Sequence, residues 1–143
     1  MNKIILTIVI AIFSLSVYAT GFENDYIVTE EGVSYYNDMN YGLSSYLIAK
    51  DENNNKIKYA KEDILQYRKD GQVFHKKDLS AKGITDENTF LKLLKTKNGF
   101  SMYMHNNYTA NGDLDQSFYV FKGNEFVLEV DKKNMMQILA FYN

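Results

Sequence analysis

The stretch of the chain that decides the fold covers residues 43–79 and reads LSSYLIAKDENNNKIKYAKEDILQYRKDGQVFHKKDL. Two turn signals, residues 51–55 and Asp70-Gly71, divide it into short runs rich in Tyr, Ile, Val and Phe. Asn- and Gly-containing turns between such runs are typical of hairpins that join consecutive antiparallel strands. The stretch therefore predicts a β-meander, with strand pairs on either side of each turn. In the run after residue 63, period-two spacing places Leu65 and Tyr67 on one face.

Similar runs lie on both sides of this stretch. Toward the N-terminus residues 37–42 read as a loop, and toward the C-terminus Asn111-Gly112 and Gly123-Asn124 read as turns. The further strands that this pattern predicts cover residues 26–28, 33–36, 100–105, 117–122 and 125–130.

Two segments instead have helical spacing. Phe90, Leu91 and Leu94 recur at that spacing, and Thr85 is suited to cap the helix, so residues 85–97 are predicted to form a mid-chain helix. The end of the chain has an Asp131 cap followed by one apolar stripe, which predicts a terminal helix packed on the sheet. The stripe consists of Met135, Ile138, Leu139 and Tyr142.

Together these elements predict a single α+β domain over residues 20–143. Its centre is expected to be a curved antiparallel sheet of about seven or eight strands. A half-barrel or a partly closed barrel is the alternative form of this sheet. The two helices are expected to cover the apolar face of this sheet.

Residues 1–19 form a segment that the mature protein is expected to lack. Lys3 supplies a positive charge, residues 4–15 are an almost unbroken apolar run, and Val17 and Ala19 are small residues at cleavage-site positions. This order is typical of a secretory signal peptide. The apolar run is shorter than the roughly 20 residues of a membrane-spanning helix. We therefore expect an exported product with no membrane span after cleavage.

Composition restricts the cellular compartment and the classes of partner that we expect for the protein. The chain has no cysteine, which excludes disulfides and a lipid-modified cysteine and favours a bacterial periplasm or exterior. Removal of Lys3 leaves 15 basic side chains against 18 acidic ones, an expected net charge of −3. Arg68 is the only arginine. Nucleic acid is therefore not an expected partner, because its binding requires clustered basic residues.

Three segments carry a resemblance to known proteins. They are the passage YAKEDILQY at residues 59–67, the passage from Phe90 to Met104, and the run YVFKGNEFVL at residues 119–128 before a short apolar helix. In these features the chain resembles a broad set of small secreted bacterial proteins of uncharacterised function. The resemblance implies a signal-directed, β-rich, single-domain product and transfers no activity.

The turn at residues 51–55 also contains a weak calcium-loop pattern. Asp51, Asn53, Asn55 and Glu62 occupy positions 1, 3, 5 and 12 of such a loop, and calcium prefers oxygen ligands. Lys56 occupies the position that requires glycine, and the flanking segments are predicted strands rather than helices. We therefore interpret the segment as an Asn-rich hairpin turn, and no metal or cofactor is expected.

Catalytic motifs are missing from the sequence. No serine lies in a Gly-x-Ser-x-Gly elbow, there is no cysteine nucleophile, and His75 and His105 are too few ligands for a zinc site. A pair of the acidic residues in a concavity of the sheet is the one catalytic arrangement left open.

Tyrosine provides the positive signal for function. The chain has 12 tyrosines, and strands favour this residue, so most of them are expected in the sheet and core. The cluster least explained by alternation consists of Tyr35, Tyr36, Tyr41 and Tyr46. Tyrosine combines an apolar ring with a polar hydroxyl, which suits protein interfaces and sugar stacking. The sequence thus predicts an exported, non-catalytic protein that binds an envelope protein or glycan, with a small secreted hydrolase as the alternative.

Overall fold

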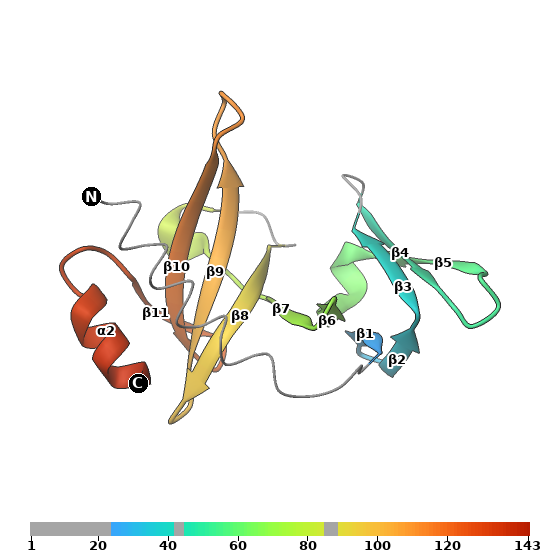
Figure 1. Cartoon of the computed structure of the whole chain (residues 1–143), viewed down its shortest axis with the longest axis horizontal. Helices are drawn as coiled ribbons and strands as arrows, with labels where there is room; N and C mark the ends of the chain where they lie inside the picture. Colours follow the sequence, from blue (N-terminus) through green and yellow to red (C-terminus); the bar gives the residue numbers. More distant parts are fainter. Residues whose placement is uncertain (1–23, 42–44, 85–88) are drawn as a thin grey trace. The chain divides into compact units, whose positions relative to one another are not determined.

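The computed structural model describes residues 24–41, 45–84 and 89–143, which contain eleven strands and one α-helix (Figure 1). Eight strands form an antiparallel sheet in the order β11-β10-β9-β8-β7-β6-β1-β2, and β3-β4-β5 form a second sheet. Because β11 and β2 end the larger sheet, it is not closed into a barrel. The strands are β1 (Asp25–Thr29), β2 (Gly32–Tyr36), β3 (Asp38–Tyr41), β4 (Tyr46–Lys50), β5 (Lys56–Ala60), β6 (Ile64–Lys69), β7 (Gln72–Lys76), β8 (Phe90–Lys97), β9 (Phe100–Tyr108), β10 (Leu114–Lys122) and β11 (Glu125–Glu129).

The chain divides into two compact units. The first covers Gly21–Leu91, and the described part of the second is Lys92–Asn143, so the boundary falls within β8. Each unit is described by itself. The expected signal peptide lies outside the described residues.

The two hairpins predicted around the turn signals are confirmed in the first unit, but the single meander sheet is wrong, because β5 and β6 lie in different sheets and β6 pairs instead with β1. β4 pairs with β5, and β6 pairs with β7 across Asp70-Gly71, both of which have positive φ angles, 51° and 74°. Such angles are typical of the tight turns that match the twist of a hairpin. The core of this unit lies between its two sheets and consists of Ile27, Tyr36, Met39, Leu47, Ala49, Ile64 and Tyr67.

The expectation that Leu65 and Tyr67 lie on one face of the strand is wrong, because β6 contains a bulge. Thr29 is aligned with Ile64 whereas Val28 is aligned with Gln66, so Leu65 is an extra residue between them. A bulge reverses the alternation of faces. Leu65 is consequently exposed, while Ile64 and Tyr67 are both buried.

The predicted mid-chain helix over residues 85–97 is also wrong. Residues 90–97 form β8, which pairs antiparallel with β9, and residues 85–88 with the Thr85 cap lie outside the described residues. The helical spacing of the leucines has a different cause. The register between β8 and β9 shifts between Leu93 and Lys95, so Leu94 is a bulge that breaks strict alternation. Among the described residues the protein is therefore largely β, with one α-helix.

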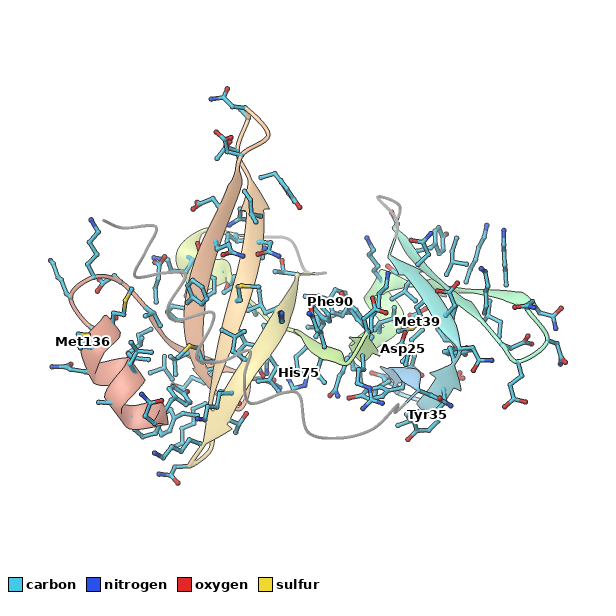
Figure 2. All side chains as sticks on the ribbon, viewed as in Figure 1. Asp25, Tyr35, Met39, His75, Phe90 and Met136 are labelled. Atoms are coloured by element: carbon cyan, nitrogen blue, oxygen red, sulfur yellow. The ribbon has the colours of Figure 1, made fainter. Side chains whose placement is uncertain are left out.

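A further correction concerns residues 37–42, which were expected to form a loop. Residues 38–41 form β3, which pairs with β4 from Asp38 opposite Lys50 to Tyr41 opposite Leu47. Met39 is almost completely buried in the core of the first unit (Figure 2). A strand of four residues is too short for alternation to give a clear signal.

The second unit consists of β9–β11, most of β8, and α2 (Met135–Tyr142). The stripe predicted for the terminal helix is confirmed, since Met135, Ile138, Leu139 and Tyr142 pack with Met102 and Val120 of the sheet. The Asp131 carboxylate accepts the backbone N–H groups of Lys133 and Asn134 ahead of the helix. Met136 points away from the strands (Figure 2). None of the helices in the described residues has the length and apolar character needed to cross a membrane.

Candidate binding surface

Of the four tyrosines expected to cluster, the three whose side chains the structure describes, Tyr35, Tyr36 and Tyr46, do not form one surface. Tyr35 and Tyr36 are consecutive in β2 and point to opposite faces: Tyr35 is 64% exposed and Tyr36 only 6%. Tyr46 is exposed on β4, in the other sheet. Tyr41 ends β3, and its side chain lies outside the described part of the structure.

Tyr36 belongs to the core of the first unit. Its hydroxyl shares a short hydrogen bond with the hydroxyl of Tyr59, and the two rings meet edge to face at 5.9 Å. Burial and the hydrogen bond with Tyr59 raise the pKa of Tyr36 to about 12. The Tyr36 phenol therefore stays neutral at physiological pH and holds the two sheets of the unit together.

Tyr35 instead lies on a surface that the sequence did not reveal. In the register of β2, β1 and β6, Tyr35 is opposite Tyr26 and Tyr26 is opposite Arg68. The next row places Val33 opposite Val28 and Val28 opposite Gln66. Opposite residues in antiparallel strands share one face. We call this surface the outer Tyr face, and it consists of Tyr26, Val28, Val33, Tyr35, Gln66 and Arg68.

Contacts between these side chains fix the Tyr26 ring. Gln66 Nε2 donates a hydrogen bond of 2.7 Å to the Tyr26 hydroxyl, and the Arg68 guanidinium lies over the ring at 5.1 Å. Arg68 Nη2 also donates to the Asn24 carbonyl oxygen at 2.7 Å. Tyr35 meets Tyr26 edge to face, with 6.2 Å between the ring centres. The exposed Tyr35 ring therefore has a preorganised neighbour.

This arrangement can bind a partner through an aromatic anchor with adjacent polar groups. Val33 and Tyr35 are more than half exposed, and the remaining four residues are half-buried. Tyrosine and arginine are enriched among residues that contribute most to protein interfaces. Binding of a partner over Tyr35 would cost little side-chain entropy at Tyr26, because the Tyr26 ring is already held in place.

The calcium-loop residues are not brought together. Asp51 and Asn55 lie in the β4–β5 turn, whereas Glu62 lies in a short 3₁₀ helix at the opposite end of β5. The Asp51 carboxylate accepts the backbone N–H groups of Asn53 and Asn55 and the side-chain amide of Asn55. The hydrogen bonds from Asn55 lower the pKa of Asp51. Asp51 thus acts as the acceptor that organises a hairpin turn.

We therefore expect calcium to leave the stability of the protein unchanged. Thermal melts in excess calcium and in excess chelator should give one melting temperature, because the Asp51 oxygens are occupied by the turn. Asp51→Ala should lower the melting temperature equally in both conditions. A melting temperature that rises with calcium in the wild type and not in Asp51→Ala would contradict this.

A carboxyl group of interest for acid–base chemistry is that of Asp25. Burial raises its pKa, and the charge of Asp70 raises it further, against a backbone hydrogen bond from Asp70 that lowers it. This hydrogen bond, 2.9 Å from the Asp70 nitrogen to Asp25 Oδ1, joins the start of β1 to the β6–β7 turn. Asp25 therefore has a structural role that accounts for its position.

The two histidines lie in different units and are half-buried in strands. Burial lowers the pKa of both His75 and His105, so both are neutral at physiological pH. Within the described residues, no group of three or more His, Asp or Glu side chains is placed to hold a metal ion.

Comparison of the chain with protein-family models, with curated proteins and with solved structures finds no match in any of the three. The resemblance to small secreted bacterial proteins thus stays a prediction.

Proposed function

We propose that the protein is an exported, non-catalytic binding protein of the bacterial cell envelope or exterior, and that the outer Tyr face contacts its partner. The observation that carries this proposal is the exposure of Tyr35 beside a Tyr26 ring held by Gln66 and Arg68. An exposed aromatic ring of this kind loses water favourably when a partner covers it.

A protein partner is favoured over a glycan. Sugars stack on the open flat face of an aromatic ring, and two rings form one continuous stacking surface only when they are nearly coplanar. Tyr26 and Tyr35 are inclined at 71°, and the Arg68 guanidinium lies over Tyr26. A mixed aromatic, aliphatic and arginine surface is typical of protein interfaces.

Alanine substitution of Tyr35 tests this proposal. Tyr35→Ala is expected to weaken saturable binding to envelope proteins by at least about fivefold, because truncation of a tyrosine central to an interface costs more than about 1 kcal/mol and about 1.4 kcal/mol corresponds to tenfold. Affinity can be measured by titrating immobilised protein with fractionated envelope extract. Stability should be preserved, since the Tyr35 side chain is exposed.

The matched control is Tyr108→Ala, whose side chain is exposed in the second unit. This variant should bind like the wild type. Equal loss in both variants would show that any exposed tyrosine suffices and would contradict the role of the outer Tyr face. Competition by soluble envelope glycans, without competition by protein fractions, would identify a glycan partner instead.

Export is part of the proposal. The supporting features are the order of charge, apolar run and small residues in positions 1–19 and the lack of cysteine. Mass determination of the protein recovered from the producing bacterium should give a chain that starts at Thr20.

A further inference from the structure

Of the four edge strands of the two described sheets, β2 differs from the other three because it carries no charged side chain. Charged side chains on an edge strand discourage pairing with another chain. Three of the described edges carry them: β11 has Glu125 and Glu129, β5 has Lys56 and Lys58, and β3 has Asp38. β2 reads Gly-Val-Ser-Tyr-Tyr and has no charged residue, no proline and no bulge against β1.

The edge of β2 is also accessible. Residues 32–35 are all exposed, and among the strands of the described residues β2 has β1 as its only neighbour. The β1–β2 turn has two residues, so Thr29 and Gly32 form the pair that closes it. Hydrogen-bonded and non-hydrogen-bonded pairs alternate from there, which directs the backbone N–H and C=O groups of Val33 and Tyr35 away from β1.

The outward backbone groups of β2 in one copy of the protein are complementary to those of β2 in a second copy. When two copies of β2 run antiparallel and are centred on Ser34, Val33 of one copy is opposite Tyr35 of the second. Each such pair exchanges two backbone hydrogen bonds, because both residues point outward. A β-branched residue opposite an aromatic ring is a favourable cross-strand pair. A register shifted by one residue would set outward groups against inward ones.

Charge at the two ends of β2 favours the same orientation. Glu30 and Glu31 precede the strand and are exposed. At its other end, Lys50 lies next to Asn37 and forms an ion pair of 2.9 Å with Asp38, and the charge of Lys69 also acts on Asp38. At this second end Asp25, opposite Tyr36, and Asp38 balance Lys50 and Lys69. Antiparallel pairing keeps the glutamates of the two copies at opposite ends of the joined strands, whereas parallel pairing would bring them together.

We propose that the protein forms a two-fold symmetric dimer in which the β2 edge strands of two copies pair antiparallel about Ser34. The pairing continues the sheet from one copy to the next and satisfies the outward backbone groups of Val33 and Tyr35. Both outer Tyr faces then lie on one side of the joined sheet, so the dimer presents two copies of the surface. The dimer does not depend on the external partner proposed above.

A charge exchange at the two-fold axis tests the dimer. Sedimentation equilibrium of the purified protein should give twice the mass of one chain. Ser34→Lys and Ser34→Glu should each be monomeric, because each places like charges directly opposite one another. An equimolar mixture of the two variants should restore the dimer. Val127→Lys, on the exposed part of the β11 edge, is the matched control and should stay dimeric.

Amide hydrogen exchange in the wild type gives a second measurement that needs no variant. Exchange at Val33 and Tyr35 should slow as protein concentration rises. A wild type that is monomeric throughout the concentration series would overturn the proposal, as would a dimer that persists in Ser34→Lys or a mixture that stays monomeric. A dimer that binds no envelope protein would support the dimer and contradict the proposed function. A monomer that binds an envelope protein would do the reverse.

Discussion

Phe121→Ala is expected to lower the free energy of unfolding by about 3–5 kcal/mol, the range for removing a fully buried aromatic ring. Phe121 has no exposed surface in the second unit. Its ring meets those of Tyr103 and Phe126 edge to face, at 5.6 Å and 5.7 Å between ring centres. The loss combines lost burial, the cavity left behind and two lost aromatic contacts. Urea denaturation measures it.

Two further variants separate these contributions. Phe121→Leu keeps most of the volume and loses the aromatic contacts, so its cost should be well below that of Phe121→Ala. Val127→Ala, on the neighbouring strand β11, is the exposed control and should change the free energy of unfolding by less than about 0.5 kcal/mol. A loss for Phe121→Ala no larger than that of Val127→Ala would contradict the packing described.

Local turn chemistry explains which parts of the fold could be predicted from the sequence. Asp70-Gly71 and Gly123-Asn124 each join two strands that are adjacent in the chain, and both hairpins are present as expected. The terminal helix was predictable because its apolar stripe and Asp131 lie within one short segment. In these cases the residues that determine the structure are close together in the sequence.

Long-range pairing explains the errors. The Leu94 spacing was compatible with a helix, and only pairing with β9 makes residues 90–97 a strand. The outer Tyr face was missed because Tyr26 and Gln66 are 40 residues apart and are brought together by the β1–β6 pairing. The one available signal was that Tyr26 and Val28 alternate in β1 while Gln66 and Arg68 alternate in β6. Neither strand identifies its neighbour from sequence alone.

The stability of the protein is expected to fall between about pH 10 and pH 12. Burial and the hydrogen bond with Tyr59 raise the pKa of Tyr36 to about 12, and burial together with the charge of Tyr103 raises that of Tyr142 to about 12. In the unfolded chain both phenols ionise near pH 10, their ordinary value. The folded state then binds more protons than the unfolded state, so stability decreases as pH rises. It is fully present below pH 10 and lost by about pH 12.

The size of this loss should be about 2 kcal/mol for each tyrosine, since one pKa unit corresponds to about 1.4 kcal/mol and solvent screening reduces the full shift. Urea denaturation over a series of pH values measures it. Tyr36→Phe and Tyr142→Phe remove the titrating groups, so each should flatten the decline, and the double variant should flatten it most. Tyr108→Phe is the control, because its side chain is exposed in the folded and unfolded chain alike. A decline as steep in the double variant as in the wild type would mean that other groups cause alkaline unfolding and that these two phenols are not held neutral by the fold.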